Sequence, residues 1–103
     1  MDRVSVLRSF VAKSPHDPFP RYGLAMELKR IGMNEEAESA FEDLLRDFPD
    51  YVPTYLMAGT FLAERGKRER ARAILAAGLD AAGRKSDLHA SRELENALAD
   101  LAK

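Results

Sequence analysis

One repeated spacing constrains this chain more than any other feature: the segment from Pro18 to Tyr51 is followed at once by a second segment with the same pattern. A shift of 34 residues pairs glycine with glycine and large apolar residues with large apolar residues. The pairs are Gly32 with Gly66, Leu28 with Leu62, Ala37 with Ala71, Phe41 with Leu75, and Leu45 with Leu79. A period of this length is typical of arrays whose unit is a pair of helices. The sequence therefore predicts an all-α repeat protein.

The residue types at fixed places in each unit resemble the tetratricopeptide repeat. The matching positions are Tyr22, Leu24, Ala25, Leu28, Gly32, Ala37, Phe41 and Pro49 in the first unit, and Tyr55, Ala58, Gly59, Leu62, Gly66, Ala71 and Leu75 in the second. The resemblance covers about residues 3–85. It departs from the family at Gly83, which replaces a final proline, and after Ser86, where polar residues take places that the family fills with apolar or small ones.

The resemblance implies one all-α domain over residues 1–103, a right-handed α-solenoid of antiparallel helix pairs. Its parts would be an N-terminal half repeat at 3–17, full 34-residue repeats at 18–51 and 52–85, and a C-terminal capping helix at 86–103. We expect six helices, at about residues 3–13, 18–31, 34–48, 53–65, 68–82 and 87–101.

Small residues explain how such helices pair. Two helix backbones approach closely only where both present small side chains, which predicts close contacts at Ala25, Ala37, Gly59 and Ala71. Gly32 and Gly66 follow the last periodic residues of their helices, as expected for left-handed caps that let the chain reverse in a short turn.

The N-terminal half repeat lacks the helix that would precede it in a longer array. Its helix should begin after Asp2, which can act as the cap, and its apolar stripe is Val4, Leu7, Phe10 and Val11. Two interpretations remain open for the uncovered side: a solvated capping helix, or a contact surface for a second copy of the chain.

By resemblance, the first helix of each pair lines a concave groove that holds a partner. The corresponding residues are Phe19, Tyr22, Met26, Lys29 and Arg30 in one unit and Leu56, Thr60, Ala63 and Glu64 in the next. Family members that clamp a terminal carboxylate use Lys, Arg and Asn at places held here by Tyr22, Met26, Leu56 and Thr60. Apolar groove residues instead suit an apolar peptide or an amphipathic helix. The alternative is that Met26 and Leu56 are core residues.

Composition argues against several other classes. The chain has 16 basic and 17 acidic residues, a net charge of -1, so no global field favours nucleic acid. The basic run from Arg65 to Arg72 has no interleaved aromatic residues. No apolar run approaches the roughly 20 residues that a membrane span needs. The segment Met1–Val4 does not resemble a secretory signal, so the expected location is the cytoplasm.

The sequence offers little for catalysis or metal binding. There is no cysteine, His16 lies in a proline-rich loop, and His89 and Glu93 share a helix face without a third ligand nearby. We therefore predict no catalytic residues, no metal and no cofactor. The predicted function is a non-enzymatic protein–protein interaction module, with no nucleic-acid or membrane partner. The alternative is a structural module that forms a homodimer through exposed helix faces.

Overall fold

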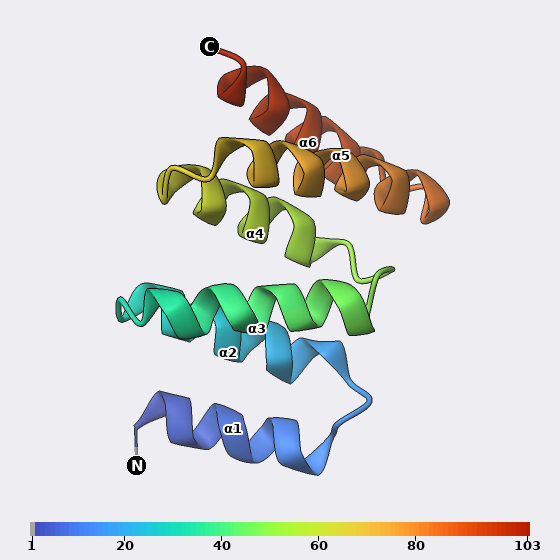
Figure 1. Cartoon of the computed structure of the whole chain (residues 1–103). Helices are drawn as coiled ribbons and strands as arrows, with labels where there is room; N and C mark the ends of the chain where they lie inside the picture. Colours follow the sequence, from blue (N-terminus) through green and yellow to red (C-terminus); the bar gives the residue numbers. More distant parts are fainter. Residues whose placement is uncertain (1) are drawn as a thin grey trace. The chain divides into compact units, whose positions relative to one another are not determined.

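The computed structural model describes residues 2–103, which form six α-helices and no strand (Figure 1). The helices are α1 (Arg3–Lys13), α2 (Pro18–Arg30), α3 (Asn34–Asp47), α4 (Pro53–Glu64), α5 (Arg68–Arg84) and α6 (Leu88–Leu101). The predicted all-α fold is confirmed, and so is each predicted helix. Met1, the first residue of the predicted domain, lies outside the described residues.

The chain divides into two compact units, residues 1–48 and 49–103. In the first unit α1 packs on α2 and α2 packs on α3; in the second unit α4 packs on α5, and α6 packs on both. Consecutive helices within each unit run in opposite directions (Figure 1). The predicted single domain, its repeat boundaries and the right-handed superhelix stay predictions.

Glycine caps reverse the chain inside each predicted repeat. Gly32 after α2 and Gly66 after α4 have φ angles of 83° and 82°. The N–H groups one residue later bond back to carbonyls of the last helical turn, Met33 to Leu28 at 3.0 Å and Lys67 to Leu62 at 2.9 Å. These bonds are the signature of the Schellman motif, in which a residue in the left-handed region ends the helix. The two predicted caps are confirmed.

A third turn of the same construction joins α5 to α6, but its left-handed residue is Ser86, with a φ of 54°. The N–H of Asp87 bonds to the carbonyl of Ala82 at 2.9 Å. A non-glycine residue costs about 1–2 kcal/mol in this conformation. No glycine marks this cap in the sequence, so it was not predicted.

The ends of α3 and α5 differ because Pro49 and Gly83 differ. Phe48, the residue before Pro49, has φ −134° and ψ 66° and ends α3. Proline disfavours the helical conformation for the residue that precedes it. Gly83 imposes no such restriction, and α5 continues to Arg84, two residues beyond its predicted end.

The Tyr55 hydroxyl donates to the Pro49 carbonyl at 2.6 Å, and burial raises the pKa of Tyr55.

Most of the repeat signature forms the core. Its buried members are Ala25, Leu28, Ala37, Phe41, Tyr55, Ala58, Gly59, Leu62, Ala71 and Leu75. Leu24 is half-buried and Pro49 is exposed. The close approach predicted at Gly59 is confirmed, because a Cβ atom there would lie 2.5 Å from Leu75 Cδ2. Gly78 was not predicted as a contact point but is packed as closely: a Cβ atom there would lie 2.6 Å from Tyr55 Cβ.

Three helical glycines provide a matched series of Gly→Ala substitutions that tests this packing. At Gly78 the clashing Tyr55 Cβ is fixed to the backbone, so we expect a loss of about 3 kcal/mol in unfolding free energy. At Gly59 the clash is with the Leu75 side chain, which can shift slightly, so we expect a loss of about 1–2 kcal/mol.

The control is Gly83→Ala, where nothing lies within 4 Å of the added Cβ. Alanine is the better helix former, so this variant should gain about 0.5–1 kcal/mol. Urea unfolding followed by circular dichroism measures all three. Equal stabilities for the three variants would contradict the packing described here.

Candidate functional site

The five groove residues predicted on α2 come together on one surface of the first unit. Phe19, Tyr22, Met26, Lys29 and Arg30 line a shallow depression of about 630 Å³, together with Arg3, Gly23 and Glu27. The α2 helix begins at Pro18, with the Asp17 carboxylate accepting a hydrogen bond from the Phe19 N–H at 3.0 Å. Residues three and four apart share a helix face, which explains why these side chains gather there.

The floor of this depression is apolar, and its most prominent side chain is Phe19, which is 66% exposed. Tyr22 and Met26 are half-buried. They are therefore neither fully buried in the core nor fully exposed to solvent. A surface of this kind offers apolar area that a bound molecule can cover.

Glu27 is the residue of this site that sequence reasoning missed. It is only 6% exposed, and its carboxylate accepts two hydrogen bonds from Arg30, from Nε at 3.0 Å and from an Nη atom at 2.5 Å. Arg3 Nε of α1 lies 3.4 Å from the same carboxylate. The three-residue spacing of Glu27 and Arg30 was the available signal, but nothing in the sequence indicated that Glu27 is buried.

The hydrogen bonds from Arg30 lower the pKa of Glu27, burial opposes that shift, and the charges of Arg30 and Arg3 add to the lowering. A buried carboxylate remains charged only when cations and donors compensate its desolvation. Glu27 thus joins α1 to α2 by an ion pair and holds two arginines beside the apolar floor.

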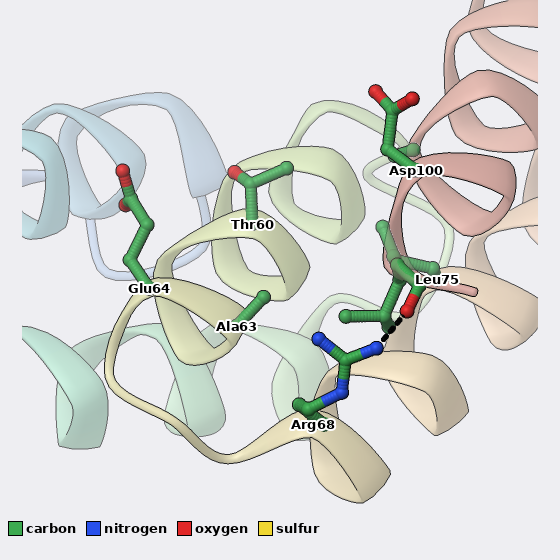
Figure 2. Close-up of a pocket in the computed structure, with 8 residues that line it drawn as sticks. Thr60, Ala63, Glu64, Arg68, Leu75 and Asp100 are labelled. Atoms are coloured by element: carbon green, nitrogen blue, oxygen red, sulfur yellow. Dashed lines mark hydrogen bonds between the residues drawn. The ribbon is translucent and has the colours of Figure 1, made fainter. Parts of the chain in front are cut away.

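Three of the four groove residues predicted on α4 line a second depression, of about 350 Å³, within the second unit (Figure 2). Thr60, Ala63 and Glu64 of α4 form it with Arg68 and Leu75 of α5, and with Ala97, Asp100 and Leu101 of α6. Leu56 is half-buried and does not line this depression; its carbonyl accepts a hydrogen bond from the Thr60 hydroxyl at 2.8 Å. That the groove residues of α2 and those of α4 form one continuous groove stays a prediction.

Arg68 closes one side of the second depression. Its guanidinium reaches from α5 and donates to the backbone carbonyl of Leu101 at the end of α6, as the dashed line in Figure 2 shows. The last carbonyls of a helix lack intrahelical donors, so a basic side chain there satisfies one of them. The carboxylates of Glu64 and Asp100 also line this depression, and Asp100 Oδ1 lies 3.5 Å from Lys103 Nζ.

Two other carboxylates, those of Asp47 and Asp2, have lowered pKa values because of hydrogen bonds that hold the fold together. Arg46 and Arg21 hold the pKa of Asp47 below its usual range by hydrogen bonding. The N-terminal cap of α1 does the same for Asp2, whose carboxylate accepts from the Ser5 N–H at 2.8 Å. Neither carboxylate lines one of the two depressions.

Two further features bear on the predicted partners. Across residues 2–103, no group of three potential metal ligands comes together, and His89 Nε2 lies 2.6 Å from Glu93 Oε1 alone. Among the helices described, none combines the length and the apolar character that crossing a membrane requires.

A model of the tetratricopeptide repeat matches residues 31–101 of this sequence. The chain belongs to the tetratricopeptide repeat family. No curated protein matches it. Domains of this family generally mediate protein–protein interaction and are typically non-catalytic, so the observed surfaces belong to a fold that commonly binds proteins.

Solved structures agree with this membership. A tetratricopeptide repeat domain protein from Salinibacter ruber, determined in solution, is 31% identical, with a TM-score of 0.80 over 84% of this chain and 88% of that one. A crystal structure of such a domain from the same organism is 30% identical and has the same TM-score, over 84% of this chain and 97% of that one. A protein from Bordetella parapertussis shares the fold, at 24% identity and a TM-score of 0.81, over 99% and 89% of the two chains.

The Glu27 ion pair predicts a pH dependence of stability. The folded-state pKa of Glu27 is lowered from 4.5, so the stabilisation is present above that pH and is lost as pH falls through the folded-state value. Glu27→Gln should therefore be less stable than the unmodified protein at pH 7, with a difference that shrinks below about pH 4.5.

Thermal unfolding at a series of pH values measures this difference, and a carboxyl-carbon NMR titration reports the pKa directly. Replacing Arg30 by Gln should move the Glu27 pKa upward. A difference between the two proteins that is constant with pH would refute the assignment.

Proposed function

We propose that this chain is a non-enzymatic adaptor. It binds a peptide or an amphipathic helix of a partner protein on the surface formed by the predicted groove residues. The observation that carries the proposal is the depression of the first unit, where Phe19, Tyr22 and Met26 leave apolar area uncovered. Apolar concavities with a few polar groups at the rim are the usual form of recognition sites. The cytoplasm is the proposed location.

The residue types at the family's clamp positions favour a side-chain-mediated contact over a terminal carboxylate clamp. Tyr22 and Met26, which line the depression, stand at places where the clamping members of the family carry charged or amide side chains, and neither residue carries a charge. Methionine adapts its shape to different apolar partners, and tyrosine combines a large apolar ring with one hydroxyl. A helix that inserts its apolar residues into such a groove is a recurring mode of peptide recognition.

The test is a double substitution, Tyr22→Ala with Met26→Ala, compared with the unmodified protein in affinity capture from cells. Because both side chains are half-buried at the surface, the fold should survive, which a melting curve checks. We expect the captured partner to fall by at least about tenfold, the loss of roughly 1.4 kcal/mol or more of binding free energy. Unchanged capture by a folded variant would remove this surface from the proposed function.

One observation favours the alternative, a homodimer. None of the residues Arg3–Lys13 of α1 is buried, and Val6 and Phe10 are 36% and 50% exposed. If these side chains form a self-association surface, sedimentation equilibrium should show a concentration-dependent dimer that Phe10→Ser weakens. A monomer at all concentrations would exclude this alternative.

A further inference from the structure

The exposed apolar residues of the first unit extend beyond the depression. Among the residues that the structure describes, six large apolar side chains are exposed, and five of them belong to the first unit. Three of these lie on the helices that border the depression: Val6 and Phe10 on α1, and Phe19 on α2.

The pairing of α1 with α2 places these residues in one strip. Arg3 meets Glu27 at 3.4 Å, and Leu7 Cδ2 lies 3.3 Å from the position of a Cβ on Gly23. The two helices are therefore antiparallel: a residue four positions later in α1 lies opposite a residue four positions earlier in α2. Since the rise per residue is the same in both helices, Phe10 lies level with the first turn of α2, which contains Phe19. The apolar strip therefore runs from Val6 and Phe10 across Phe19 to Met26.

The charged residues that line the depression are mostly of one sign. The depression is lined by three bases, Arg3, Lys29 and Arg30, and by one acid, Glu27, which is buried beneath two of them. Helix α1 carries no acidic residue, and Lys13 lies in its last turn. Arg3 and Arg30 are mostly exposed although both reach Glu27, so their charge also faces the solvent.

We propose that this strip, formed by Val6, Phe10, Phe19, Tyr22 and Met26, binds an amphipathic helix whose apolar residues are flanked by carboxylates. This inference rests on the proposed function and names the partner's chemistry. The apolar residues of the helix fill the depression, and its Glu or Asp side chains meet Arg3, Lys29 and Arg30 at the rim. Charge complementarity of this kind selects the partner and speeds its association.

Two other occupants fit less well. A second copy that paired α1 antiparallel with its own α1 would bring Arg3 of one copy near Lys13 of the other, and like charges in contact disfavour a complex. An anionic membrane surface would satisfy the bases, but a flat surface cannot fill a depression of about 630 Å³.

The test uses two synthetic helical peptides of about five turns, acetylated and amidated so that neither end is charged. Both have the same Leu and Phe residues at helical spacing; one has Glu at the flanking positions and the other has Lys. Fluorescence anisotropy measures their affinities for the full chain at low and at physiological salt. We expect the Glu peptide to bind at least about tenfold more tightly than the Lys peptide, with an affinity that falls as salt is raised.

Matched variants locate the contact. Phe10→Ser and Phe19→Ser each remove an exposed apolar side chain, and Arg3→Gln removes a base that is 79% exposed; each should weaken the Glu peptide several-fold. The controls are Leu88→Ser, which removes an exposed apolar side chain of α6, and Arg72→Gln, which removes an exposed base paired with Glu69. Neither control should change the affinity.

Amide NMR shifts decide which depression is used. The Glu peptide should shift the amide signals of Gly23 and Met26 and leave those of Ala63 and Ala97, in the depression of the second unit, unchanged. Equal affinities of the two peptides, tighter binding of the Lys peptide, or shifts confined to Ala63 and Ala97 would overturn the inference.

The remaining outcomes separate this inference from the proposed function. If neither peptide binds but the chain binds phosphatidylserine vesicles, the strip is a membrane contact and the inference is wrong. If neither peptide binds but Tyr22→Ala with Met26→Ala still abolishes capture of a cellular partner, the inference fails and the proposed function stands. If the Tyr22→Ala, Met26→Ala variant captures the partner as well as the unmodified protein does, the proposed function is wrong, whatever the peptides show.

Discussion

The close approach of paired helices at small residues is the constraint on which the rest of the structure depends. At Gly59 and Gly78 even one added carbon would overlap a neighbouring side chain, and Ala37 and Ala71 at the start of the second helices are completely buried. Such contacts fix how far apart two helix axes lie and which faces meet. Three turns of the Schellman type then let the chain reverse within a few residues, so that consecutive helices pack against each other.

Packing of this kind assigns each helix two surfaces with different roles. On α2, Ala25 and Leu28 are buried, while Phe19, Tyr22 and Met26 remain at the surface and line a depression. Because Ala25 and Leu28 face the core, the larger side chains on the other face of α2 remain available for a partner. The scaffold therefore holds these side chains on a rigid helix, which lowers the entropy lost on binding.

Electrostatics distinguish the two depressions of the molecule. In the first unit a buried Glu27 holds Arg3 and Arg30 beside apolar side chains. In the second unit Arg68 donates to a backbone carbonyl, and the other charged lining residues are the acids Glu64 and Asp100. One fold thus presents two chemically different surfaces.

The sequence by itself determined the fold class, the six helices, the glycine caps and the buried small residues, because a 34-residue period and helical spacing are local properties of the chain. It also grouped the α2 side chains correctly, since residues three and four apart share a face. Only the tertiary structure decided that Glu27 is buried, that Gly78 is a contact point against Tyr55, and that Arg68 caps α6. Each of these depends on what a distant segment places opposite the residue. Burial and pairing are set by distances between helices, and no local pattern encodes those distances.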